Sequence, residues 1–238
     1  MVSAGLWSSG SIDVVGFPWC KDAPKKVGLG SLTAKILCRT HNNALSPVDS
    51  AASAAFETLR KVTEATSTDR KASKLPKRPA RFEIPEPWLL ERWFLKTALN
   101  LCVVADSKEV WRQTRLPLSQ LPEKLVQIAF GLEPFVKPMG LYATAALGEN
   151  VAVSEGVSFS PLIYGEEGMI GALFTFRGFR FVLHLEPLEL PAVLEVPGVG
   201  VRHWPTGKLL YHHQRYNWAV GRKITRYVQL LWHLQPSA

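Results

Sequence analysis

The chain has 238 residues, of which 47% are apolar and 20% charged, and it carries a net charge of +8. This composition excludes a disordered or fibrous protein, and the length allows a large core in one domain or two. No apolar run reaches the roughly 18–20 residues of a membrane helix, and three widely spaced cysteines exclude a disulfide framework, so the sequence predicts a cytoplasmic protein without a membrane span.

The first strong element is a helix over residues 46–65. Ser46 is the expected N-cap, Pro47 suits the first helical position, and Asp49 suits the positive end of the helix dipole. Apolar residues then recur at helical spacing as far as Val62. Before this helix, residues 34–38 read as a short strand that enters a tight turn at Cys38–His41.

Residues 66–81 are polar, basic and proline-containing, which is typical of a flexible linker. We therefore predict an N-terminal unit over 1–65, a basic linker over 66–81 and a main domain over 82–238.

The main domain is predicted to begin with two helices. The first runs from Glu86-Pro87 to Val104, and its periodicity predicts an apolar face that excludes Glu91 and Lys96. The second begins near Ser119 and ends at Gly131, which suits a left-handed C-terminal cap.

From about Gly140 the period changes from helix to strand. Residues 170–176 and 179–185 are rich in β-branched and aromatic side chains, and the two-residue link Arg177-Gly178 predicts a hairpin. Trp204–Gly207 predicts a turn between strands 199–203 and 208–212, and 224–234 alternates as a half-buried strand. The predicted fold class is α+β, with an N-terminal helical part followed by a mostly antiparallel β-sheet.

The most specific motif is Cys38-x-x-His41-Asn42 ahead of the 46–65 helix. This spacing allows a thiolate and an imidazole to reach one tetrahedral zinc ion. A plainer interpretation is also open, in which Cys38 is a small buried hydrophobe and His41 and Asn42 are polar turn residues.

The run from Leu37 to Asp49 resembles the distal half of HNH-like (His-Me finger, treble-clef) endonuclease-type zinc proteins, in which a Cys-x-x-Cys or Cys-x-x-His pair is followed by Asn and a helix. The resemblance covers a small part of the chain and makes residues 1–65 a partial treble-clef-like unit. It implies Cys38 and His41 as zinc ligands, with Cys20 as the one cysteine upstream.

Two parts of the family pattern have no counterpart here. A closed zinc site needs four ligands, and Cys20, Cys38 and His41 provide three. The histidine that acts as general base in these nucleases is absent, because no histidine precedes His41. We therefore assign no catalytic residue, predict no enzyme activity, and expect a chain that is either N-terminally truncated or degenerate.

The positive charge is concentrated in two segments. Residues 60–81 hold eight basic and two acidic side chains, and residues 201–238 hold six basic side chains and no acidic ones. Basic side chains bind phosphates and aromatic ones stack on bases, whereas the plainer interpretation is a solvated surface. The predicted nucleic-acid-binding residues are Lys71, Lys74, Lys77, Arg78, Tyr211, Arg215, Tyr216, Arg222 and Lys223.

Together these features favour an HNH-like remnant that binds DNA or RNA without a complete nuclease site. The alternative is a non-catalytic protein that binds a protein partner or a second copy of itself. A metal-dependent nuclease is the third reading.

Overall fold

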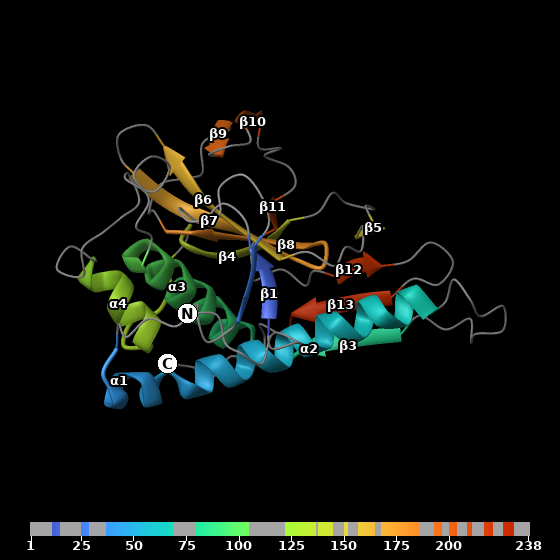
Figure 1. Cartoon of the computed structure of the whole chain (residues 1–238), viewed down its shortest axis with the longest axis horizontal. Coiled ribbons are helices and arrows are strands. Elements are labelled where there is room, and N and C mark those ends of the chain that lie inside the picture. The colour runs from blue at the N-terminus through green and yellow to red at the C-terminus, as the bar shows by residue number, and fades with distance from the viewer. Residues whose placement is uncertain are drawn as a thin grey trace.

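A computed structural model describes the chain over residues 11–14, 25–28, 37–68, 80–104, 122–136, 138–144, 150–151, 157–164, 168–185, 193–196, 200–203, 209–210, 217–220 and 226–230. Helices dominate the first half of the chain and strands the second, and the main sheet is antiparallel throughout (Figure 1). The predicted α+β class is confirmed.

The helices form where local signals are strong. They are α1 (Arg39–Ala44), α2 (Ser46–Thr68), α3 (Pro87–Val104) and α4 (Glu123–Phe130). Proline opens α3, at the position where its missing N–H costs nothing. Gly131 ends α4 with a φ of 74°, as its sequence position predicts.

Two of these helices differ from the sequence prediction at their ends. The helix predicted over 46–65 continues to Thr68, and strand β3 (Ala80–Ile84) begins inside the predicted linker. Helix α4 begins at Glu123, with Pro122 as its N-cap, later than the start predicted near Ser119. Residues 69–79 lie outside the described residues.

The main sheet has seven strands in the order β10-β9-β6-β7-β8-β4-β11. They are β4 (Gly140–Thr144), β6 (Val157–Tyr164), β7 (Gly168–Phe176), β8 (Phe179–His184), β9 (Val193–Val196), β10 (Gly200–His203) and β11 (Leu209–Leu210). The hairpin predicted at Arg177-Gly178 is confirmed: both turn residues have positive φ, 49° and 93°, which matches the twist of the flanking strands.

The second predicted hairpin, between 199–203 and 208–212, is wrong. β10 pairs with β9, and β11 pairs instead with Ala143 and Thr144 of β4. The Pro-Gly signal at 205–207 marks a break between strands, but a break does not determine which strands pair.

A second sheet of four strands lies beside α2. Its order is β3-β13-β12-β5, with β13 (Arg226–Leu230), β12 (Asn217–Val220) and β5 (Asn150–Val151). β13 pairs in parallel with β3 and antiparallel with β12. Val228 and Leu230 are buried, as the alternation of the predicted strand requires. A separate two-stranded sheet joins β1 (Ser11–Val14) to β2 (Lys25–Gly28).

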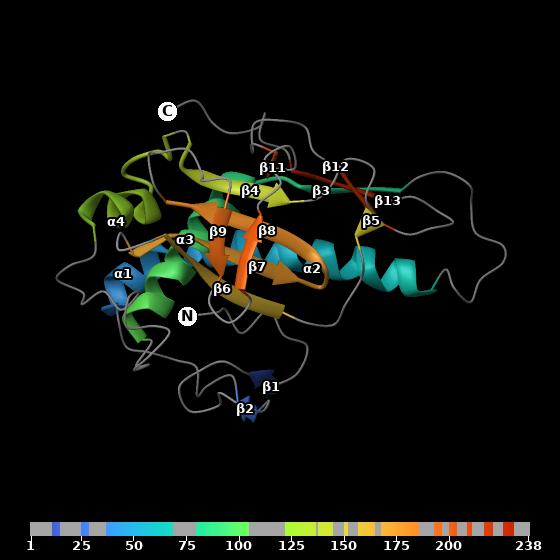
Figure 2. The same cartoon turned by 90° about the horizontal axis from the view of Figure 1, so that it is seen from above.

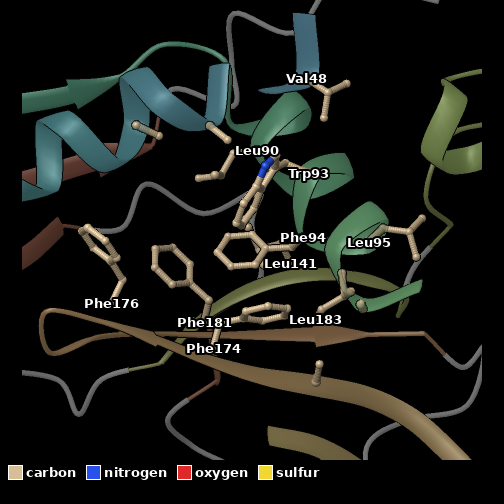
Figure 3. Close-up of a cluster of buried hydrophobic side chains, with 14 of the residues drawn as sticks. Val48, Leu90, Trp93, Phe94, Leu95, Leu141, Phe174, Phe176, Phe181 and Leu183 are labelled. Carbon is tan, nitrogen blue, oxygen red and sulfur yellow. The ribbon is translucent and has the colours of Figure 1, made fainter. Parts of the chain in front are cut away.

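The sheet lies above α3 in Figure 1 and overlaps it when seen from above in Figure 2, and the buried core draws on both layers. Figure 3 shows Phe94 of α3 next to Phe174 and Phe181 of the sheet, with ring centroids 4.5 and 5.0 Å away. Each fully buried aromatic or aliphatic side chain contributes about 1.5–3 kcal/mol to folding.

Helix α2 belongs to the same core. Its buried stripe, Val48, Ala52, Ala55, Phe56, Leu59 and Val62, follows the helical period and joins the cluster formed by α3, β7 and β8. Phe56 packs against Trp93 of α3 and Phe176 of β7. The proposed division at 66–81 stays a prediction, and described residues on both sides of it share one core.

The predicted apolar face of α3 is wrong at Glu91 and Lys96. Both are buried, at 5% and 6% exposure, although the periodicity places them outside the apolar face of α3. Each has a polar partner: Glu91 accepts the backbone N–H of Leu141, and the Lys96 ammonium donates to both carboxylate oxygens of Asp49. These contacts make burial of the two side chains tolerable.

None of the helices in the described part of the chain is both long and apolar enough to cross a membrane.

Candidate metal half-site and nucleic-acid interface

Cys38 and His41 lie together at the start of α1. Cys38 is the N-cap residue, and His41 is the third residue of the helix. The Cys38 Sγ atom is 3.2 Å from Nδ1 of His41, and both side chains are exposed. The Cys38 carbonyl accepts the N–H of Asn42 at 2.9 Å, which closes the first turn and holds the two side chains on one side of it.

This separation fits two ligands of one zinc ion. A tetrahedral site with a Zn–S bond of about 2.3 Å and a Zn–N bond of about 2.05 Å places its sulfur and nitrogen about 3.5 Å apart. The observed 3.2 Å needs only a small opening of the pair to admit an ion.

Two predictions for this stretch need correction. The Cys38–His41 segment is the beginning of a helix and not a turn between a strand and a later helix. The plainer interpretation of Cys38 as a buried hydrophobe is also wrong, because its free thiol is exposed. Residues 34–36 of the predicted strand lie outside the described residues.

Helix α4 supports the imidazole. The Phe130 ring meets the His41 ring edge to face, with centroids 5.6 Å apart and planes at 70°. Phe130 itself packs on the main core. Arg92 of α3 holds this end of α4 because its Nε donates to the Ala129 carbonyl at 3.1 Å, and burial lowers the pKa of the Arg92 guanidinium.

The pair provides half of a donor set. In the described ranges, no group of three or more His, Cys, Asp or Glu side chains is placed to hold a metal ion. Cys20, the third predicted ligand, lies outside those ranges. The donor chemistry of Cys38 and His41 suits zinc, and the pair would provide two of the four ligands of a closed site.

The nine predicted nucleic-acid-binding residues lie outside the described part of the chain. Two strands that follow them are described, however. β3 begins at Ala80, directly after the segment with Lys77 and Arg78, and β13 begins at Arg226, shortly after Arg222 and Lys223.

These two strand starts are paired. The parallel register places Ala80 opposite Arg226 and Arg81 opposite Tyr227. Because parallel strands share a direction, β3 and β13 begin side by side at the same end of the sheet. β12, which follows Arg215 and Tyr216 in the sequence, is antiparallel to β13 and begins opposite Gln229, at the other end of the sheet.

The two candidate features are separated in the fold. In Figures 1 and 2, α1 and α4 lie at one end of the molecule, whereas β12 and β13 lie toward the other. A ligand at the paired strand starts and a metal ion at α1 would therefore not touch each other.

No known protein family, curated protein or solved structure matches this chain.

Proposed function

We propose that this chain binds nucleic acid through the end of the four-stranded sheet where β3 and β13 begin, without acting as a nuclease, and that Cys38 and His41 hold a zinc ion. One observation supports the binding function above the others: the parallel pairing of Ala80 with Arg226. It brings together the starts of two strands that each follow a basic segment of the sequence, and clustered basic side chains attract phosphates.

The resemblance to HNH-like zinc proteins supports the same function. It predicts a nucleic acid as the partner and a zinc ion at Cys38 and His41, while the missing general base argues against cleavage. The zinc ion would fix the first turn of α1 and would take no part in phosphate chemistry.

Salt dependence tests the binding function. Binding is measured by fluorescence anisotropy with labelled single- and double-stranded DNA and RNA, between 50 and 300 mM salt. The logarithm of the association constant should fall linearly with the logarithm of the salt concentration. Loss of one phosphate contact should lower the magnitude of this slope by about one. An absence of salt-dependent binding to all of the probes contradicts the proposed function.

Paired charge reversals locate the surface. We expect Lys77→Glu with Arg78→Glu, and separately Arg222→Glu with Lys223→Glu, each to weaken binding by roughly tenfold or more and to lower the slope by about two. The matched control is Lys25→Glu with Lys26→Glu, because these two lysines are exposed on β2 of the separate two-stranded sheet. Equal losses in all three variants would indicate only a net-charge effect.

The alternative function is binding of a protein partner. The exposed apolar residues Leu132 and Val136 after α4 favour it. Self-association that is indifferent to salt, in a chain that binds no nucleic acid, would support this alternative.

A further inference from the structure

Helix α1 presents a zinc donor set that is half complete. Cys38 and His41 are exposed, their donor atoms are adjacent, and the described residues bring no third ligand to them. Structural zinc sites in proteins are closed by four ligands. Two further ligands must therefore come from outside the described residues, either from the rest of the chain or from another molecule.

A second copy of the chain would provide the missing donors in the right kind and number. In a two-fold symmetric dimer, any residue at the axis meets its own counterpart. Two Cys38–His41 pairs around one ion on that axis form a Cys₂His₂ set, which is a common tetrahedral zinc site. Two thiolates also neutralise the charge of the ion, so the site adds no net charge to a pair of chains that each carry +8.

Exposed apolar side chains follow α4, the helix whose Phe130 ring meets His41. They are Leu132 and Val136, which are 77% and 55% exposed. The His41–Phe130 contact places this end of α4 against α1. An interface centred on the zinc ion would bury such residues at its core.

The C-terminal cap of α4 shows why Leu132 stays exposed within one chain. The N–H of Gly131 bonds to the Ile128 carbonyl and that of Leu132 to the Gln127 carbonyl, which is a Schellman motif. An apolar contact between the residues at the Leu132 and Gln127 positions usually accompanies this motif. The polar Gln127 offers no such contact, so Leu132 has apolar surface to bury against another molecule.

We propose that two copies of this chain share one zinc ion through Cys38 and His41 of each copy, with Leu132 and Val136 at the surrounding interface. This inference rests on the zinc part of the proposed function. Each Cys38 thiol releases its proton to solvent when it binds the ion as a thiolate, and each imidazole binds in its neutral form.

Metal titration of the full-length chain tests the proposal. The metal-free protein, kept in a phosphine reductant so that no disulfide forms, is titrated with Co²⁺ and then Zn²⁺ while absorbance and light scattering are followed. We expect saturation at one ion per two chains, a molar mass twice the 26.5 kDa of one chain, and return to the monomer with a chelator. Native mass spectrometry should show a dimer with one zinc ion.

Point variants distinguish the loss of a zinc ligand from the loss of the fold. Cys38→Ser and His41→Ala should each abolish both the cobalt spectrum and the dimer, with unchanged circular dichroism because both side chains are exposed. Cys20→Ser and Cys102→Ser are the matched controls and should retain both. Leu132→Ser should weaken the dimer at least tenfold, with the same cobalt spectrum at saturation.

The outcomes distinguish this inference from the function on which it rests. A monomer that binds one zinc ion per chain, with loss in Cys20→Ser, would overturn the shared site but would leave the zinc part of the proposed function intact. A dimer that persists in chelator would also overturn the shared site. Failure to bind zinc in any state would overturn both.

Discussion

The carboxyl group of Glu91 accepts the backbone N–H of Leu141 at 2.7 Å and so joins helix α3 to strand β4. In the described part of β11, Leu209 and Leu210 pair with Thr144 and Ala143 of β4. The side chain of Glu91 thus provides a hydrogen bond to β4 outside the stretch that β11 covers. A carboxyl group in this position is buried for a structural reason.

We predict that this carboxyl makes the protein less stable at alkaline pH. Burial raises the pKa of Glu91 from 4.5 to about 8, while the bond from Leu141 opposes the rise. Between these values the folded chain holds a proton that the unfolded chain has lost, so stability falls as pH rises through that window. A shift of this size corresponds to a loss on the order of 5 kcal/mol, complete above the folded-state pKa.

Glu91→Gln isolates this effect from all other titrating groups. The amide stays neutral at every pH and keeps an oxygen that can accept the Leu141 N–H. Urea unfolding at intervals from pH 5 to 9 should show a steeper fall for the native chain than for the variant. Parallel curves for the two proteins would contradict a proton held by Glu91.

A second prediction concerns the ion pair between Lys96 and Asp49. The Lys96 Nζ atom is 2.7 and 2.6 Å from the two carboxylate oxygens of Asp49, and the side chains are 7% and 29% exposed. Asp49→Asn leaves a buried ammonium without its carboxylate, so we expect a loss of about 3 kcal/mol in the free energy of unfolding.

Replacement of the other partner, Lys96, should lower the free energy of unfolding by less. Lys96→Met removes the more buried charge and leaves the more exposed carboxylate, which water can still solvate. The double variant should recover most of the stability lost in Asp49→Asn. Denaturant midpoints of the four proteins form a double-mutant cycle, and additive losses would show that the pair is not coupled.

The fold could be predicted from the sequence where the signals are local. The helical spacing of apolar residues and Pro87 were enough for α2 and α3, and the two-residue link Arg177-Gly178 was enough for the β7–β8 hairpin. Strand partners that are distant in sequence were not predictable. β3 pairs with β13, which lies close to the C-terminal end of the sequence. β11 pairs with β4 and not with β10, the strand before it.

The candidate sites show the same limit. Cys38 and His41 are three residues apart, so their spacing alone predicted two adjacent ligands. Phe130 meets His41 only through the packing of α4, and no periodicity in the sequence indicates that contact. Glu91 and Lys96 were misplaced because their partners are 50 and 47 residues away and the charge of a side chain normally indicates exposure.

The close approach of β7 and β8 gives a third prediction, at Gly171. A Cβ atom built on Gly171 would lie 2.3 Å from the carbonyl oxygen of Leu183, which is backbone and cannot rotate away. The register of β6 and β7 also shifts next to this residue, between Leu162 and Ile163. Gly171→Ala should therefore force the two strands apart, with a loss on the order of 3 kcal/mol or more.

The neighbouring residue provides the matched control. Ala172→Gly changes the same number of atoms on the same strand, and it should cost about 1.5 kcal/mol through added freedom of the unfolded backbone and the loss of one buried methyl group. Urea midpoints of the two variants, measured at one pH, give the comparison. If Gly171→Ala is no less stable than Ala172→Gly, the strands can separate at little cost, and the contact of Gly171 with β8 does not constrain the sheet.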